Sequence, residues 1–191
     1  MDHGNGKPDD ANIFLKPFVE EMKVLQQHGL ICLNRNCHVY ISKIICDSPA
    51  RAFITKTTRH AGYESCSKCI QREEFSPHVI LNNTFSDLGT DNSFRMKTNP
   101  GHHTGDSVLE ELNIGMVSQI ALDYMHIVCL CVTKRLLSLW VKGTRDVKLD
   151  DKTRDTVSKY LLTFKAHIPA EFSRLPSALK DYMNWKESQT T

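Results

Sequence analysis

The fold is decided by residues 41–70, which read ISKIICDSPARAFITKTTRHAGYESCSKCI. The segment begins inside an apolar, β-branched run, Val39 to Cys46, whose composition predicts a buried strand. The run stops at Asp47, and Ser48-Pro49 breaks it. We therefore expect a strand that ends in a carboxylate, followed by a loop that leaves this carboxylate reachable.

Asp47 has two interpretations from its local sequence. It could hold a divalent cation such as Mg²⁺, because hard cations prefer oxygen ligands, and nucleic-acid enzymes place two such cations across a phosphodiester. The alternative is structural, with the Asp47 side chain forming an Asx turn close to Pro49. The local sequence leaves both interpretations open.

Nineteen residues after Asp47 comes a Cys-x-x-Cys pair, Cys66 and Cys69. Its spacing suits two thiolates on one Zn²⁺, which is half of a tetrahedral site. The sequence has no second Cys-x-x-Cys, so the remaining ligands would be His or Asp side chains: His102 or His103 in a Gly-flanked loop, His126 and Asp123. The alternatives are two free thiols in a turn, or a redox pair, which the polar residues before Cys66 disfavour.

Composition sets broad bounds. The chain has 191 residues, of which 40% are hydrophobic and 24% charged, as expected for a globular domain. A net charge of +2 neither requires nor excludes a nucleic-acid partner. No apolar run approaches the roughly 20 residues of a membrane span, so we expect no membrane association. Seven cysteines without a secretory signal predict an intracellular, reducing location.

Periodicity divides the rest of the chain. Residues 1–12 are predicted to be a flexible tail, and a helix is predicted from Ile13 onward with Phe14, Phe18, Met22 and Leu25 on its apolar face. Residues 50–57 fit a short helix or a strand. Residues 73–105 are polar and punctuated by Pro and Gly, which predicts a long insertion or a loop held by a metal or a partner.

A helix within residues 114–140 is predicted to be buried, because it is apolar nearly all round. Its beginning could be a separate short element. Asp123 and His126 would share one face of it, either as a simple hydrogen-bonded pair or as ligands. Lys134 and Arg135 mark a solvent edge or contact a DNA backbone. A last helix, with Val157, Tyr160, Leu161 and Phe164 on its apolar face, is predicted to start at Asp150 or Asp151.

The order of four motifs, CDSPARAF, GYESCSKC, HHTG and GMVSQIALDYMHIVCLCVTKRLLSLW, resembles the transposases of CACTA (En/Spm)-like DNA transposons. The resemblance extends from about residue 14 to residue 185. It implies an α/β (mixed α+β) fold, namely an RNase H-like core with a mixed sheet flanked by helices and a zinc-type insertion. It also implies a nuclear enzyme that cleaves DNA at transposon ends and joins the 3′ hydroxyl to target DNA, using a DDE set of acids with Mg²⁺ or Mn²⁺.

Carried over residue by residue, the resemblance makes Asp47 the second acid of that set and Cys66 and Cys69 the zinc pair. Asp123 and His126 match an Asp-x-x-His element that completes or supports the zinc site, and a second assignment makes Asp123 itself a catalytic acid. The first acid of the family lies upstream of this chain, and a later one lies beyond residue 185. Residues 13–191 are thus expected to be a partial core, inactive alone, whose incomplete sheet leaves an edge for self-association. The alternative function is a non-catalytic DNA- or protein-binding zinc module.

Overall fold

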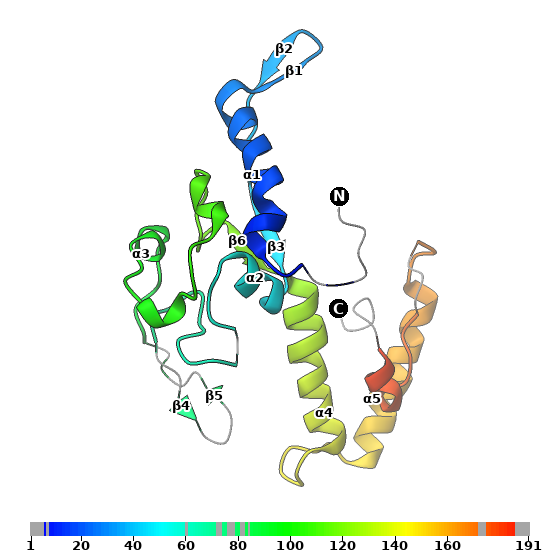
Figure 1. Ribbon diagram of the computed structural model, residues 1–191. Helices are drawn as coiled ribbons and strands as arrows, with labels where there is room; N and C mark the ends of the chain where they lie inside the picture. Colours follow the sequence, from blue (N-terminus) through cyan, green and yellow to red (C-terminus); the bar gives the residue numbers. More distant parts are fainter. Residues whose placement is uncertain are drawn as a thin grey trace. The chain divides into compact units, whose positions relative to one another are not determined.

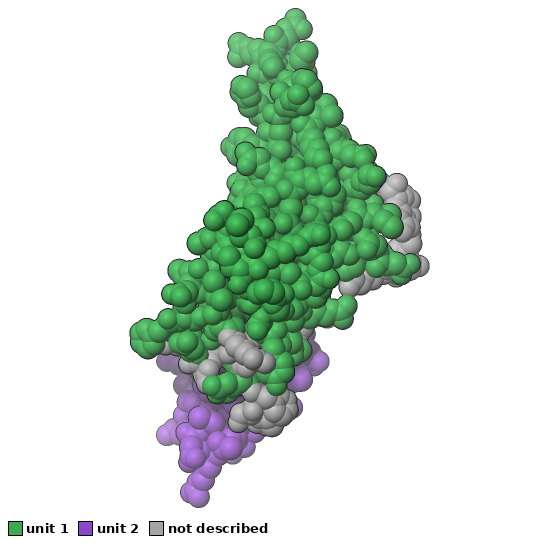
Figure 2. Space-filling view, turned by 60° about the vertical axis from the view of Figure 1, so that its left-hand side comes forward, with its two compact units in different colours: residues 1–122 green, residues 123–191 purple. Residues whose placement is uncertain are grey.

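The chain forms two compact units, residues 1–122 and residues 123–191, in a computed structural model that mixes helices with short strands (Figures 1 and 2). The structure describes residues 6, 8–59, 61–71, 74–75, 79–80, 83, 85–171 and 175–185. This confirms the predicted α+β class at its coarse level. Residues 1–5 and 7 of the predicted tail, residues 1–12, lie outside the described residues, and residues 11 and 12 are helical. Among the residues that are described, no helix is both long enough and apolar enough to cross a bilayer.

Unit 1 begins with helix α1, Ala11–His28, whose start is fixed by a side-chain cap. Asp10 accepts hydrogen bonds from the backbone N–H groups of Asn12, at 2.6 Å, and Ile13, at 3.2 Å. The helix ends at Gly29, which has a positive φ of 73°. A side chain there would collide with Asn36 and the backbone of Cys37. The predicted helix is therefore confirmed, with a start two residues earlier.

The buried face of α1 differs from the predicted one. Ala11 and Val19 are buried, whereas Phe14 and Phe18 are exposed. Leu15 and Met22 pack on the core of unit 1. The buried set recurs every three or four residues, as a helix requires, but it is rotated from the aromatic face. The face predicted to be buried carries the larger side chains, whereas the tertiary contacts bury the neighbouring face of α1.

A two-stranded antiparallel hairpin follows, made of β1, Leu30–Cys32, and β2, Arg35–Cys37. Its two turn residues, Leu33 and Asn34, have positive φ angles of 48° and 58°. Positive φ at both positions is typical of the type I′ turn, whose twist matches that of the strands. The hairpin projects from the C-terminal end of α1 (Figure 1).

The quoted segment contains strand β3, Ile44–Cys46, which pairs in parallel with β6, Ile120–Leu122. The prediction of a buried strand from Val39 to Cys46 is wrong in extent and in burial, since only three residues are paired and Ile45 is 68% exposed. Successive side chains of a strand point to opposite faces, and only the Ile44 side packs on the core. After Asp47 the chain enters helix α2, Ser48–Ile54, so residues 50–57 are mainly helical.

The polar segment 73–105 holds more structure than predicted. Strand β4, Glu74–Phe75, pairs with β5, Val79–Ile80. Helix α3, Asp91–Arg95, starts at a capping box formed by Thr90 and Ser93, and a 3₁₀ turn, η1, covers Pro100–His102. Phe94 enters the core and is only 4% exposed. The prediction of a loop is therefore wrong for residues 91–95 and 100–102, whose helices are too short to show a period.

A second 3₁₀ turn, η2, covers Val108–Glu111 and packs against α1. It contributes to a single apolar core in unit 1, drawn from α1, α3, η2 and β6. The buried members of this core are Val19, Phe94, Leu109, Leu112, Ile114, Met116 and Ile120.

Asp91 ties α3 to the turn that leads into β6, and this predicts a measurable stability contribution. Its carboxylate accepts bonds from the backbone N–H groups of Val117, at 2.6 Å, and Ser118, at 2.9 Å, and from the Ser118 hydroxyl at 2.6 Å. Replacing Asp91 with alanine is expected to lower the free energy of unfolding by about 2 kcal/mol, because two backbone donors lose a charged acceptor. Urea unfolding at pH 7 measures this, with the exposed Asp87→Ala as control.

The Asp91 carboxylate is also expected to make the free energy of unfolding depend on pH. Burial alone would raise the pKa of Asp91, but hydrogen bonds from Ser118 and Val117 outweigh it and hold the pKa below its ordinary value of 3.8. Because folding lowers the pKa of Asp91, the contribution of its carboxylate to the free energy of unfolding is fully present above pH 3.8. This contribution is lost as the pH falls through the lowered pKa. The stability difference between wild type and Asp91→Asn should therefore shrink below pH 4, and a constant difference down to pH 2 would contradict this assignment.

Unit 2 is helical. A π-helical segment, η3, covers Met125–Thr133 and continues into α4, Lys134–Lys142. Helix α5, Asp151–Thr163, is followed by the 3₁₀ turns η4, Phe164–His167, and η5, Leu179–Asn184. The core of this unit contains Leu137, Leu179, Tyr182 and Trp185.

Two predictions for unit 2 have different outcomes. Asp150 caps α5 by accepting a bond from the Thr153 backbone N–H at 2.9 Å, as predicted, although Tyr160 and Phe164 are exposed. The helix predicted within residues 114–140 is confirmed, and its beginning is a separate element, β6, but the prediction that the helix is buried is wrong. The helical path begins near residue 125, after β6, and Leu136 and Trp140 are exposed. A stretch that is apolar on every side has no distinct hydrophobic face, so its sequence could not indicate which side packs against the core.

Candidate metal centre

The Cys-x-x-Cys pair lies on a loop that a neighbouring strand-like segment holds in place. Cys69 forms an antiparallel bridge with Leu88, and the Ile70 N–H donates to the Asp87 carbonyl at 2.8 Å. The Cys69 thiol donates toward the Cys66 sulfur, with 2.9 Å between the two sulfur atoms. Both sulfur atoms are therefore held side by side by main-chain contacts.

The His102-His103 pair is joined to the chain that leaves α2. His103 forms an antiparallel bridge with Thr57, and the Thr58 N–H donates to the His102 carbonyl at 2.8 Å. The Phe94 ring meets both imidazoles edge-on, at centroid distances of 4.6 Å to His103 and 6.3 Å to His102. These contacts fix the two rings beside the core of unit 1.

The cysteine loop and the histidine pair meet at one small cavity. Its volume is about 30 Å³, which accommodates one ion or one water molecule rather than an organic ligand. The potential ligands that line it are Cys66, Cys69, His102 and His103. Two thiols and two imidazoles are a donor set that zinc prefers in structural sites.

The hydrogen bonding of the histidines suits metal binding. His102 Nδ1 lies 2.7 Å from the Glu64 carbonyl, which only accepts, so Nδ1 carries the proton and Nε2 remains the basic nitrogen. His103 Nδ1 is buried and has no hydrogen-bond partner among the described residues. Burial, and then the neighbouring His102, lower the pKa of His103 and favour the neutral form that can bind a metal.

Zinc binding would require a larger change at the two thiols than at the two histidines. Burial raises the pKa of Cys69, and the contact with Cys66 raises it further, so without a metal this group stays a thiol. Two sulfurs on one tetrahedral zinc, with bonds of about 2.3 Å, would be about 3.8 Å apart. The observed separation is 2.9 Å, and no three His, Cys, Asp or Glu side chains of the described part stand ready to hold a metal. The donor set thus matches zinc in kind, but the four side chains as they stand do not form a metal site.

Asp47 makes a structural contact, which is a helix cap rather than the Asx turn of its second interpretation. Its side chain caps α2 by accepting a bond from the Ala50 N–H at 2.7 Å. It also follows the last paired residue of β3, Cys46, whose partner in β6 is Leu122. Leu122 is itself followed in the chain by Asp123. An aspartate therefore comes directly after each of two paired parallel strands.

Asp123 and His126 form the pair that their spacing predicted. Asp123 Oδ2 lies 2.5 Å from His126 Nδ1, and Asp123 Oδ1 accepts from the Met125 N–H at 2.9 Å. The bond from His126 lowers the pKa of Asp123. His126 does not line the small cavity described above, and its side chain is 51% exposed. The pair begins the π-helical segment, a form of helix that is frequent at functional sites.

Three further residues are Lys134 and Arg135, which were predicted to contact DNA, and Arg51, which was not predicted to have a role. Lys134 and Arg135 begin α4, and Arg135 is exposed, so DNA contact by this pair stays a prediction. Arg51 of α2 is a buried arginine whose burial the sequence did not indicate. A charged residue four positions after a helix cap usually faces solvent, so nothing in the local pattern marks it.

Comparison of the chain with protein-family models, with curated proteins and with solved structures finds no match in any of the three.

Proposed function

We propose that this chain is part of the catalytic core of a DDE-type DNA transposase, with a structural zinc centre in unit 1. The observation that carries the proposal is the meeting of Cys66 and Cys69 with His102 and His103 at one ion-sized cavity. The two pairs are more than thirty residues apart in the chain. The likeness to CACTA-type transposases implies a zinc pair that follows a catalytic aspartate in the chain, and the histidines at this cavity supply two further donors of a suitable kind.

Asp47 is the carboxylate assigned to catalysis, and Asp123 is the second choice. Mg²⁺ or Mn²⁺ held by such acids would activate the attacking oxygen and stabilise the leaving one. Asp47 is oriented by its bond to the start of α2, and Asp123 is oriented by His126 and the Met125 N–H. A carboxylate that is already held by a local donor loses little freedom when it binds a cation. Zinc has a separate role, because it stabilises the unit that carries Asp47.

The assignment of Asp47 is tested by its conservative substitution. Asn caps a helix as well as Asp does, so Asp47→Asn should preserve α2 and remove only the charge. We expect zinc-loaded wild type to bind Mn²⁺, measured by electron paramagnetic resonance of the free ion. Asp47→Asn should weaken this binding by about tenfold or more, because ligand charge sets affinity for hard cations. Asp87→Asn is the matched control.

Supercoiled plasmid DNA gives the second readout. DNA binding should weaken steeply with salt, since phosphate contacts release counterions. Cleavage that needs Mn²⁺ and is lost in Asp47→Asn would place catalysis in this chain by itself. Mn²⁺ binding that is equal in wild type and Asp47→Asn would contradict the DDE assignment, and DNA binding that remains would then indicate a non-catalytic zinc module.

A further inference from the structure

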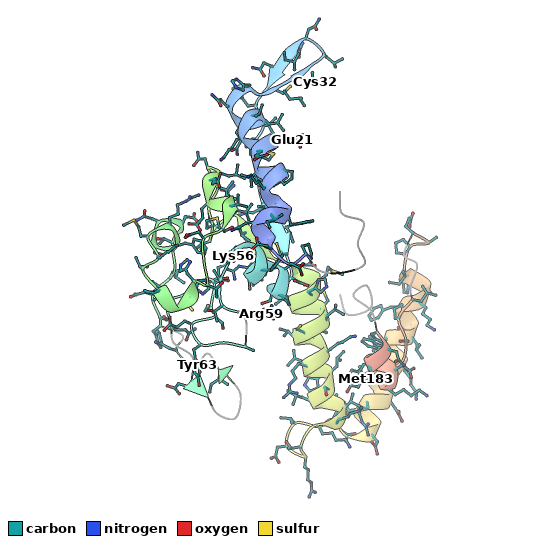
Figure 3. All side chains as sticks on the ribbon, in the orientation of Figure 1. Glu21, Cys32, Lys56, Arg59, Tyr63 and Met183 are labelled. Carbon is teal, nitrogen blue, oxygen red and sulfur yellow. The ribbon has the colours of Figure 1, made fainter. Side chains whose placement is uncertain are left out.

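Helix α1 and the β1–β2 hairpin together form an arm of unit 1, residues 11–37, that exposes large apolar side chains. Every residue of both strands is exposed, and the hairpin projects from the C-terminal end of α1 (Figures 1 and 3). A two-stranded hairpin without a packed face is at best marginally stable in water. Exposed apolar patches of this kind often mark interaction sites. The exposed large apolar residues of the α1–hairpin arm are Ile13, Phe14, Phe18, Val24, Leu30, Ile31 and Leu33.

The apolar residues that α1 exposes share one side of the helix. Ile13, Pro17 and Val24 follow one another at spacings of four and seven residues, which return to the same side of an α-helix. Phe14 and Phe18 lie next to this line, four residues apart. The residues of α1 that pack on the core of unit 1 lie on the opposite side. Helix α1 is therefore apolar on two sides, and the structure covers one of them.

The area of the exposed side is that of one half of a stable interface between proteins. A large aliphatic or aromatic side chain carries roughly 60–120 Å² of apolar surface by its transfer free energy. The seven residues range from 40% exposed at Phe18 to 93% at Leu33, so the arm exposes about 300–500 Å² of apolar surface. A standard interface buries about 800 Å² on each partner, of which a little over half is apolar. The arm alone supplies this apolar part.

The charges along α1 are complementary to those of a second, antiparallel copy of the same helix. Lys16 precedes Phe18 in the chain, and the acids Glu20 and Glu21 follow it. When two copies of α1 pack antiparallel about a two-fold axis close to Phe18, Lys16 of each copy comes opposite Glu20 of the other. Within one copy, Lys16 Nζ and Glu20 Oε1 are 3.9 Å apart and both side chains are exposed, so both can reach a second partner.

The two ends of the arm are complementary in the same arrangement. Residues 24–46 contain no acidic residue, and Arg35 is exposed in β2. Antiparallel packing brings the hairpin of each copy toward the N-terminal end of α1 in the other, where Asp9 is exposed. The same register places Ile13 of one copy beside Val24 of the other. Opposite charges thus flank an apolar centre.

We infer that the α1–hairpin arm is the interface of a two-fold symmetric dimer of this chain, in which the two copies of α1 pack antiparallel with Phe18 at the axis. The dimer does not depend on the zinc centre or on DNA cleavage. It also differs from self-association through a sheet edge, which would involve β3 and its exposed residue Ile45.

Phe18→Asp tests the apolar centre of the interface. Equilibrium sedimentation of the full chain measures the dissociation constant of the dimer, and this constant should rise by about 100-fold or more, because a charge would be buried at the axis. Phe85→Asp is the matched control, since Phe85 is an exposed residue of the same unit outside the arm. It should dimerise as wild type does. Both variants should remain folded in thermal melts, because neither ring is in a core.

Lys16→Glu and Glu20→Lys test the antiparallel arrangement. Each variant alone places like charges opposite each other on both sides of the axis and should dimerise at least about tenfold more weakly than wild type. An equal mixture of the two restores opposite charges at both places, so it should form a mixed dimer about as tightly as wild type. Parallel packing would place residue 16 opposite residue 16 and leave each single variant as strong as wild type.

Three results would overturn the inference. The first is wild type that stays monomeric at about 100 μM, which is weaker than a specific dimer of this interface size requires. The second is a dimer that survives Phe18→Asp but is lost in Ile45→Lys, which would place the interface at the sheet. The third is a dimer that both single charge variants form as well as wild type does, because the antiparallel contact between Lys16 and Glu20 would then be wrong.

Discussion

Replacing Cys69 with serine should abolish zinc retention and remove the response of the thermal midpoint to zinc. Structural zinc contributes about 10–16 kcal/mol of apparent binding free energy in small zinc domains at pH 7, which equals or exceeds the stability of a typical domain. Wild type should therefore melt at a much lower temperature after chelation. Cys69→Ser should melt at this lower temperature with or without added zinc, as calorimetry and metal analysis can show.

Cys32→Ser is the matched control for this experiment. Cys32 lies on the exposed β1–β2 hairpin of the same unit, at the opposite end of α1 from Lys56 (Figure 3). It should bind zinc as wild type does and show the same shift on chelation. If Cys69→Ser kept one zinc per chain, or if Cys32→Ser lost it equally, the ligand assignment would be wrong.

Replacing Phe94 with alanine should produce the largest loss of stability that does not depend on a metal. Phe94 is buried in the core of unit 1 and its ring supports both histidines edge-on. Truncating a buried phenylalanine typically costs about 3–5 kcal/mol, through lost transfer energy and the cavity left behind. Urea unfolding of the zinc-free protein measures this loss, and zinc affinity should fall as well, because His103 loses its support.

Phe85→Ala is the control for Phe94→Ala, because it makes the same chemical change at an exposed position. Phe85 lies in the same unit and is 95% exposed, so its truncation should alter the free energy of unfolding by less than about 0.5 kcal/mol. Equal effects of the two substitutions would contradict the core described here. A loss confined to zinc affinity would instead mean that Phe94 acts only on the histidines.

Local signals predicted the elements whose boundaries depend on local bonds. Asp150 caps α5 as predicted, whereas Asp10 and Asp47 cap helices that were not predicted to start there. An aspartate before a periodic run carries this information in its own sequence neighbourhood. The hairpin of residues 30–37 was not predicted, because Leu33 is a rare residue at a position of positive φ.

Features that depend on distant partners could not be predicted in this way. The sequence offered His102, His103, His126 and Asp123 as ligand candidates, and it could not indicate that a bridge between Thr57 and His103 joins the histidine pair to the chain after α2. Phe94 lies in a five-residue helix, too short for a hydrophobic period. Arg51 is buried by neighbours that its own segment does not specify.

The pairing of β3 with β6 has a consequence for how the chain acquires its structure. Ile44 and Ile120 are partners although they are 76 positions apart, and the cysteine and histidine loops both lie between them. Closing such a long loop costs chain entropy before any pairing energy is gained, so this ladder should form late in folding. A metal that first joins the two intervening loops would shorten the path between the strands. During synthesis, β3 must wait without its partner until residue 122 has been made.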